Sequence, residues 1–248
     1  IQFYFREGIT WSTISSNFLS MRYSPFGFVF ETKGAMCFAR SKDQLLEILA
    51  YANTPLVNHF LSAVSPTLDF HEGPVARLPY SPSSEVLGRE NSQCCVRVTQ
   101  EDWDAYERSW DFHSLPLLPA TSQPTPPHAS TNTAWTTQTK VTTPEMKRLE
   151  EENNRLSIDA YGLAEELNPD APTEQITLTV NPAYRYGGKL TEEEQGTRFR
   201  QDTREELVSY AIGCMMGRYS LDAPGLIYAH SGNEGFDPSQ YTTFPADD

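Results

Sequence analysis

The sequence predicts an α+β fold, in which a small block of strands and short helices is followed by a mainly helical part. Phenylalanines alternate with other residues from Phe26 to Phe30, and this period of two is typical of a half-buried strand. Apolar residues recur at intervals of three and four within residues 41–64 and 144–219, which indicates amphipathic helices. Residues 1–5 also have the composition of a strand, so we expect the chain to be part of a longer protein.

The first elements follow from turn and capping residues. A turn over residues 32–34 allows residues 35–39 to return as the partner of the strand at 26–30, which places Phe26, Phe28 and Phe30 in the core. Ser41 and Gln44 form a capping box that begins a helix ending near Asn53.

The next elements follow from prolines and from apolar runs. Pro55 suits the first turn of a second helix, and Ser65-Pro66 ends that helix. Residues 73–80 and 94–98 indicate extended segments, so the α+β block ends near residue 115.

Residues 116–143 differ in composition from the rest of the chain. This range holds five Pro, nine Thr and two Ser, and Lys140 is its one charged residue. Such a stretch buries too little apolar surface to offset the entropy of ordering, which predicts an extended or mobile linker. We therefore expect three parts: a domain at 1–115, a linker at 116–143, and an acidic, mainly helical domain at 144–248.

The last part begins with a helix at Pro144 whose apolar positions alternate in steps of three and four. This seam indicates either an ordinary helix packed against its own domain or a dimeric coiled coil, and Asn153 is a polar residue on it. Residues 174–180 are a candidate strand, and Thr191 with Glu194 caps a further helix. A helix is also indicated by an apolar stripe expected to be core, with Gly213 and Gly217 permitting close approach of another backbone; the stripe comprises Leu207, Val208, Ala211, Ile212, Met215, Met216 and Tyr219.

The net charge of −14 is unevenly distributed. Residues 1–100 hold eight Lys and Arg against eight Asp and Glu, whereas residues 101–248 hold eleven against twenty-five. Because phosphate contacts supply much of the affinity of DNA-binding proteins, a DNA-binding role is confined to the first part.

Motifs for self-contained chemistry are scarce. The four cysteines form no Cys-x-x-Cys pair and the five histidines show no metal spacing, so we expect reduced thiols and no metal site. The sequence has no phosphate-binding glycine motif, no signal peptide and no apolar run long enough to span a membrane, and we expect a cytoplasmic protein. Residues 181–184 (Asn-Pro-Ala-Tyr) resemble the Asn-Pro-Pro-Tyr motif of amino-methyltransferases, but Ala183 replaces the second proline.

Five long blocks, in order, resemble the C-terminal part of the PglX family, the adenine-specific DNA methyltransferases of bacteriophage-exclusion (BREX) systems. The blocks are residues 5–36, 45–80, 145–172, 176–194 and 204–238, and the linker is the part that departs from the family pattern. The resemblance implies a target-recognition domain followed by a C-terminal helical domain. It also implies that the catalytic domain, with its S-adenosylmethionine and its Asn-Pro-Pro-Tyr pocket, lies upstream in the parent protein.

On this reading the chain is the DNA target-recognition portion of a site-specific adenine methyltransferase, with no catalytic residues and no cofactor of its own. Its partners are double-stranded DNA, the missing methyltransferase domain and other defence-system proteins. Arg22 and Arg40 are the candidates for base or phosphate contact, Lys33 for phosphate contact, and Tyr23 for packing against sugar or base, with Trp11 beside them.

Each candidate has an alternative. Arg22 can instead pair with Glu31 across the sheet. The whole chain can instead be an interaction module that docks defence subunits or the catalytic domain, or a self-contained methyltransferase that uses Asn181 to Tyr184.

Overall fold

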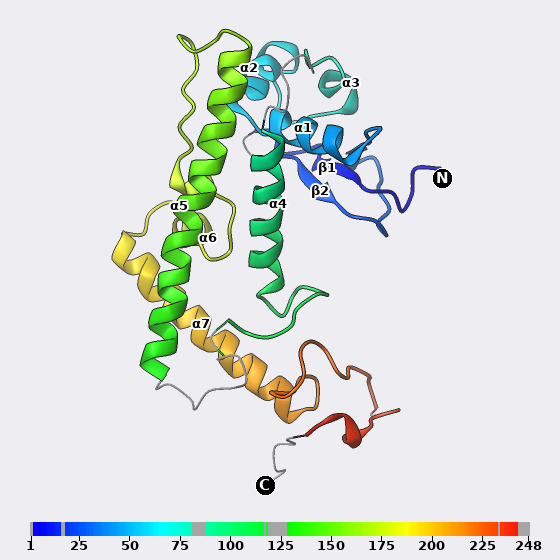
Figure 1. The fold of residues 1–248 in the computed structure, drawn as a ribbon, viewed down its shortest axis with the longest axis vertical. Helices are drawn as coiled ribbons and strands as arrows, with labels where there is room; N and C mark the ends of the chain where they lie inside the picture. Colours follow the sequence, from blue (N-terminus) through cyan, green and yellow to red (C-terminus); the bar gives the residue numbers. More distant parts are fainter. Residues whose placement is uncertain are drawn as a thin grey trace. The chain divides into compact units, whose positions relative to one another are not determined.

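The fold is α+β, with a three-stranded antiparallel sheet and a set of helices (Figure 1). A computed structural model describes residues 2–15, 18–80, 88–116, 118, 128–232 and 234–242, leaving out the side chains of 128–140. The chain forms two compact units: the first comprises residues 1–97 and 146–171, and the second comprises residues 98–145 and 172–248. Whether the three parts expected from the sequence fold as separate domains stays a prediction.

The sheet consists of β1 (Gly8–Ser12), β2 (Arg22–Ser24) and β3 (Gly34–Cys37) in the order β2-β1-β3. Thr10 on the central strand lies opposite both Arg22 and Met36. Since side chains alternate along a strand, these three residues share one face of the sheet, and the buried residues flanking Thr10 face the other.

The predicted strand at residues 26–30 is wrong, because β3 pairs with β1 and residues 25–30 form a loop. Gly27 has a φ of 103°, which interrupts extended pairing. The loop is held instead by the N-terminal segment: the Phe5 N–H donates to the Phe28 carbonyl oxygen at 2.9 Å. Phe26 and Phe28 are consequently exposed, not core, and Phe30 is half-buried.

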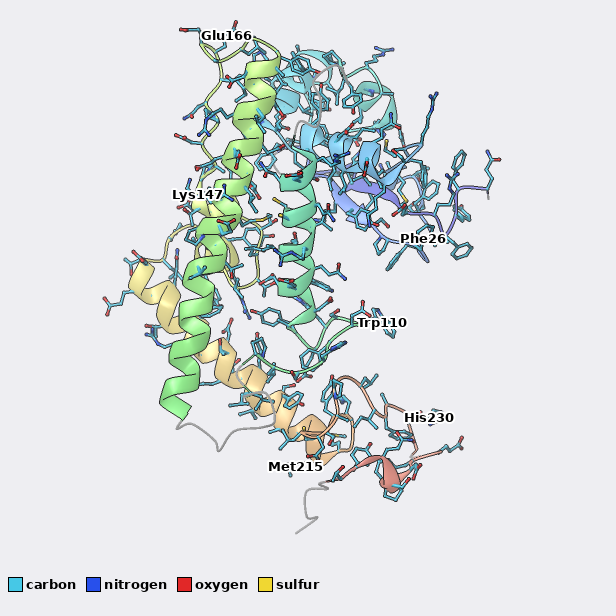
Figure 2. The ribbon with its side chains drawn as sticks, in the orientation of Figure 1. Phe26, Trp110, Lys147, Glu166, Met215 and His230 are labelled. Carbon is cyan, nitrogen blue, oxygen red and sulfur yellow. The ribbon has the colours of Figure 1, made fainter. Side chains whose placement is uncertain are left out.

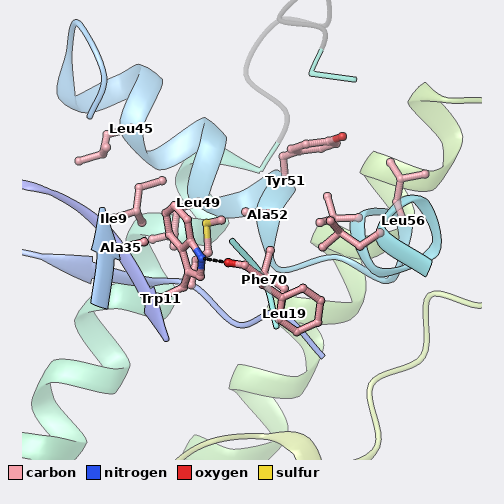
Figure 3. Packing of buried hydrophobic residues seen from close by; sticks show 13 residues of the cluster. Ile9, Trp11, Leu19, Ala35, Leu45, Leu49, Tyr51, Ala52, Leu56 and Phe70 are labelled. Carbon is pink, nitrogen blue, oxygen red and sulfur yellow. Dashed lines mark hydrogen bonds between the residues drawn. The ribbon is translucent and has the colours of Figure 1, made fainter. Parts of the chain in front are cut away.

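Both early helices are confirmed as α1 (Lys42–Ala52) and α2 (Pro55–Val64). The Ser41 side chain accepts from the Gln44 N–H at 3.2 Å, and Pro55 occupies the first turn of its helix. Figure 3 shows the core that α1 forms with the sheet. Within this core the Trp11 indole N–H donates to the Phe70 carbonyl oxygen at 2.8 Å.

Neither of the two extended segments predicted next, at residues 73–80 and 94–98, is a strand. Residues 72–75 form α3 (Glu72–Val75), and residues 94–98 lie inside α4 (Arg89–Asp104). The inward face of α4 includes Ser92 and Asp102, two buried polar residues, so no continuous apolar pattern marks this helix in the sequence.

Helix α5 (His128–Ala160) begins inside the predicted linker and passes through Pro144. The extended conformation predicted for residues 128–143 is therefore wrong, and residues 119–127 lie outside the described part. Once a helical turn exists, each added residue gains a hydrogen bond, so the helix extends upstream even through a Thr-rich stretch.

The apolar seam on α5 packs within the first unit. Met146 and Leu149 are buried, whereas Leu156 is exposed. The Asn153 side-chain amide donates to the Ala50 carbonyl oxygen on α1 at 2.9 Å. This contact supports a helix packed against its own unit rather than a coiled coil.

The second unit contains η1 (Thr173–Gln175), α6 (Pro182–Tyr186), α7 (Glu192–Met215) and η2 (Pro238–Gln240). The predicted strand at 174–180 is wrong, although its alternation is real. Every second side chain there is buried, but the backbone pairs with a carboxylate: the Thr179 and Val180 N–H groups donate to Asp102 at 2.6 and 3.0 Å.

The capping box of α7 is confirmed at Thr191 and Glu194, but the expected core stripe is largely exposed. Of the stripe, Tyr219 is buried as expected and Leu207 packs against the same cluster, whose other members are Phe112, Leu115, Tyr210 and Cys214. The Tyr219 ring packs directly against Gly213, where a Cβ would clash with it. The close approach at Gly213 is therefore made by a side chain of the same chain and not by another backbone.

A candidate nucleic-acid interface

Arg22 lies on the open face of the sheet. Helix α1 covers the opposite face, because Ile9 and Trp11 pack into one buried cluster with the leucines of α1 (Figure 3). The Arg22 side chain is exposed, and within the described residues no carboxylate pairs with it. The alternative pairing with Glu31 is not formed, since the Glu31 carboxylate accepts from the Lys33 N–H and the Thr32 hydroxyl.

Two asparagines hold the segment that leads into β2. The Asn53 side chain accepts from the Met21 N–H at 2.7 Å and donates to the Met21 carbonyl oxygen at 2.9 Å. The Asn58 side chain accepts from the Leu19 N–H at 3.2 Å. These bonds fix the backbone immediately before Arg22, a role that the sequence, in which Asn53 serves only as a helix end, does not reveal.

Tyr23 points to the other side of the sheet from Arg22. Its hydroxyl donates to the Glu7 carboxylate at 2.7 Å, and the Lys42 ammonium lies 5.6 Å from its ring centroid. Burial, with the Glu7 carboxylate nearby, raises the pKa of Tyr23 to about 12. The Tyr23 ring stabilises the Lys42 ammonium by a cation–π contact. Lys42 is an exposed cation that the sequence analysis did not select.

Lys33 and Arg40 flank β3 at its two ends. Lys33 lies in a turn closed by the Gly34 N–H, which donates to the Glu31 carbonyl oxygen at 3.1 Å. The backbone N–H of Arg40 donates to the Gln44 side chain at 3.0 Å, just before α1. Both side chains are exposed. The four predicted residues thus occupy separate places around one sheet: Lys33 and Arg40 lie beyond the two ends of β3, and Arg22 and Tyr23 lie on opposite faces of β2 at the other edge.

Trp11, expected beside these residues on the surface, is buried at 5% exposure. Its alternation with Thr10 on β1 places the indole in the core, where its N–H bonds to the Phe70 carbonyl oxygen. The prediction of a surface role for Trp11 is wrong.

The Asn181–Tyr184 segment is committed to structure. The Asn181 amide donates to the carbonyl oxygens of Thr173 and Ile176 at 2.7 and 2.8 Å, and its oxygen accepts from the Ala183 N–H at 3.2 Å. Asn181 is 1% exposed and caps α6. Its amide is occupied by the chain's own backbone, so the geometry offers no support for a base-binding pocket there.

Other chemistry finds little support in the described residues. They contain no group of three or more His, Cys, Asp or Glu side chains arranged to hold a metal ion. The nearest acid–base neighbours are His71 and Asp69, an exposed pair 3.0 Å apart. Among the described helices, none combines the length and apolar character that crossing a membrane requires.

Comparison with known proteins finds two relatives that match nearly the whole chain. Over 250 residues, 98% of this chain, the sequence is 36% identical to the adenine-specific methyltransferase BrxX of Escherichia coli O9:H4 (strain HS). Over 249 residues it is 35% identical to the adenine-specific methyltransferase PglX of Lacticaseibacillus casei (strain Zhang). Nearly the whole chain is therefore similar to one part of two adenine-specific methyltransferases.

The resemblance to the PglX family inferred from the sequence blocks is thereby confirmed. The matched part is 20% of the BrxX chain and 19% of the PglX chain, so this segment spans about one fifth of the PglX-family relatives it matches. No protein-family model matches the segment.

Proposed function

We propose that this segment is the DNA target-recognition portion of a site-specific adenine DNA methyltransferase in a BREX phage-defence system. It represents the C-terminal part of the longer protein, acts in the cytoplasm where host DNA lies, and has no catalytic residues or cofactor of its own. Similarity over 98% of the chain to a fifth of two adenine-specific methyltransferases supports a partial role of this kind.

The observation that carries the proposal is the placement of exposed cations around one sheet. Arg22, Lys33, Arg40 and Lys42 project from a sheet and helix in the part of the chain where charges balance. The rest of the chain is strongly acidic and is repelled by phosphate. Arg22, on the open face, is suited to guanine because a guanidinium donates to two acceptors in the major groove. The cations at the strand ends suit phosphates on either side.

The reaction itself belongs to the remainder of the longer protein. A methyltransferase that modifies an adenine in a duplex rotates the base out of the stack into a pocket, and S-adenosylmethionine supplies the methyl group. The role of this segment is to bind duplex DNA at a defined sequence, so that the correct adenine lies at that pocket. The backbone just before Arg22, held by Asn53 and Asn58, suits this positioning role.

The test is removal of the cations in the full-length protein. Replacing Arg22, Lys33 and Arg40 together with Ala is expected to weaken duplex binding on the order of thirtyfold, because contacts with the phosphates and a base are lost. The slope of log affinity against log salt concentration is expected to decrease by roughly 2, since each phosphate contact contributes about 0.9. A gel mobility shift at several salt concentrations measures both quantities.

A matched control removes the same charge elsewhere. Arg77→Ala, Lys189→Ala and Arg204→Ala together alter three exposed cations that belong neither to the strands nor to the residues that flank them. The proposal requires this control to retain affinity within about threefold. Equal weakening of both variants, or no weakening of the first, contradicts the assignment.

A protein-interaction role is the second candidate, favoured by the exposed apolar side chains of α7. Val208, Ile212, Met215 and Met216 are all at least half exposed. Solvent-exposed apolar patches of this kind are typical of protein contacts. Co-purification of defence-system proteins that is lost on replacing these residues with Ser, while DNA binding stays unchanged, would favour this role.

A further inference from the structure

Aromatic side chains gather at one end of the sheet in the first unit. We call them the N-terminal aromatic cluster; its members are Phe3, Tyr4, Phe5, Phe26, Phe28, Phe30 and Phe38. An inner layer of rings is mutually packed, with centroids 5.2 Å apart for Phe3 and Phe38 and 5.5 Å apart for Phe30 and Phe38. Figure 2 shows Phe26 projecting from this end of the sheet.

The outer members of the cluster are exposed. Phe5, Phe26 and Phe28 are 60%, 69% and 55% exposed, and Val29 beside them is 61% exposed. With about 200 Å² for each aromatic side chain, these residues present on the order of 400 Å² of apolar surface. Interfaces between domains of one chain bury roughly 600–1,500 Å² over both sides, so the cluster has the size of one side of such an interface.

The exposed rings are held in place by backbone contacts. Phe5 has a φ of 65°, a left-handed conformation that is rare for an aromatic residue. Two hydrogen bonds keep it there: its N–H donates to the Phe28 carbonyl oxygen at 2.9 Å, and its carbonyl oxygen accepts from the Gly27 N–H at 3.2 Å. Strained backbone that persists in this way is characteristic of functional surfaces.

The charges around the cluster favour a protein surface as its partner. Arg6 is the one cation in residues 2–6 and 25–30, and its guanidinium stacks over the Phe3 ring at 5.7 Å. The flanking residues include a carboxylate, Glu7, which is bonded to the Tyr23 hydroxyl. A surface rich in aromatic residues with a single Arg matches the core of a protein–protein interface rather than a duplex-binding face.

We propose that the N-terminal aromatic cluster packs against an apolar surface of the methyltransferase part of the same longer polypeptide. The inference rests on the proposed function, in which this segment is a portion of such a protein. The relatives carry about four fifths of their length outside the matched part, which supplies an occupant. Residues 3–5, which precede β1, belong to the cluster.

This contact sets the geometry of recognition. Phe3, Tyr4 and Phe5 precede β1 in the chain, and Phe26 and Phe28 follow β2. The cluster is therefore joined directly to the strand that carries Arg22. Packing the cluster against the catalytic part fixes the distance between the DNA-contacting side chains and the reacting base. If the cluster were instead free to move relative to the catalytic part, that distance would not be fixed.

Oxidative footprinting of the full-length protein without DNA tests the proposal. Hydroxyl radicals label exposed rings, and the labelling rate of each, corrected for intrinsic reactivity, reports its exposure. Phe5, Phe26 and Phe28 are expected to be labelled at least fivefold more slowly than their exposure in this segment requires, whereas Trp110, 97% exposed, is labelled fully. Labelling of the three rings in proportion to that exposure overturns the proposal, as does protection that arises only when duplex DNA is added.

A pair of variants gives a second measurement. Phe26→Ser with Phe28→Ser is expected to raise labelling of the remaining Phe5 ring at least fivefold in the full-length protein, because the contact opens. The control, Val208→Ser with Met215→Ser, removes equally exposed apolar groups on α7 and is expected to leave Phe5 protected. Equal labelling of Phe5 in both variants contradicts the proposal. Because no DNA is present, protection of the cluster with failed DNA binding would refute the proposed function and leave this inference standing.

Discussion

Replacing Asp102 with Ala is expected to destabilise the second unit by about 3 kcal/mol, because two buried backbone N–H groups lose their acceptor. The Asp102 carboxylate is 8% exposed and accepts from the Thr179 and Val180 N–H groups, so it takes the place of a neighbouring strand. Without it the extended segment that carries the buried Ile176, Leu178 and Val180 has no partner at this point.

Hydrogen exchange of the Thr179 and Val180 amides measures this effect locally, and urea unfolding measures it globally. In the variant, both amides are expected to exchange more than a hundredfold faster, as a loss of about 3 kcal/mol requires. Asp111→Ala removes an exposed carboxylate nearby and is expected to change stability by less than about 0.5 kcal/mol. Unchanged protection of the two amides in Asp102→Ala would show that the carboxylate does not support the segment.

Replacing Glu150 with Gln is expected to stabilise the protein by about 3 kcal/mol above pH 8 and to have no effect below pH 4. Burial, together with the adjacent Glu151 carboxylate, raises the pKa of Glu150 to about 7. Lys147 compensates little, because it bonds to Glu151 and to the Ala171 carbonyl oxygen. The folded state therefore binds this proton more tightly than the unfolded chain, whose carboxyl has the ordinary value of 4.5.

The stability that the neutral carboxyl permits is complete below pH 4.5 and is lost as the pH rises through 7. Each pKa unit corresponds to about 1.4 kcal/mol, which gives the expected total. Urea unfolding of both proteins between pH 4 and pH 8 measures the difference. Glu166→Gln, at an exposed position of the same unit, serves as the control and is expected to show no such pH dependence. A constant difference for Glu150→Gln across this range would refute the assignment.

The capping signals in the sequence predicted the starts of three helices, whereas α3, α4 and the first part of α5 were predicted as extended. Ser41 and Pro55 mark the starts of α1 and α2, and Thr191 marks the start of α7, because capping depends on neighbours in the chain. The sequence could not show which face of a helix or strand would be buried. The α7 stripe and the Phe26–Phe30 alternation both have the expected period, yet both are largely exposed, since burial depends on distant partners.

Polar residues in buried positions explain the other differences. Ser92 and Asp102 interrupt the apolar pattern of α4, and the segment at 174–180 alternates like a strand but pairs with Asp102 rather than with a sheet. Such pairings between residues far apart in sequence leave no periodic signal.

Residue type and charge were enough to predict which side chains of the candidate interface are exposed, but not how these side chains are arranged. Arg22, Lys33 and Arg40 are exposed as expected, whereas Tyr23 turned out to support Lys42, and Asn53 to hold the backbone before Arg22. Arg22 and Tyr23 are neighbours on β2, so their side chains point to opposite faces of the sheet. The sequence pattern placed the strand at residues 26–30 and therefore did not predict this separation.

The most direct test exchanges the recognition segment and maps the methylated site. In the full-length protein, residues 1–248 are replaced together, so that neither compact unit is divided, by the equivalent segment of a PglX-family relative that methylates a different sequence; the modified adenines are located by methylation sequencing of host DNA. Our account predicts that the methylated sequence follows the donor of the segment. Methylation that retains the recipient's sequence would contradict it.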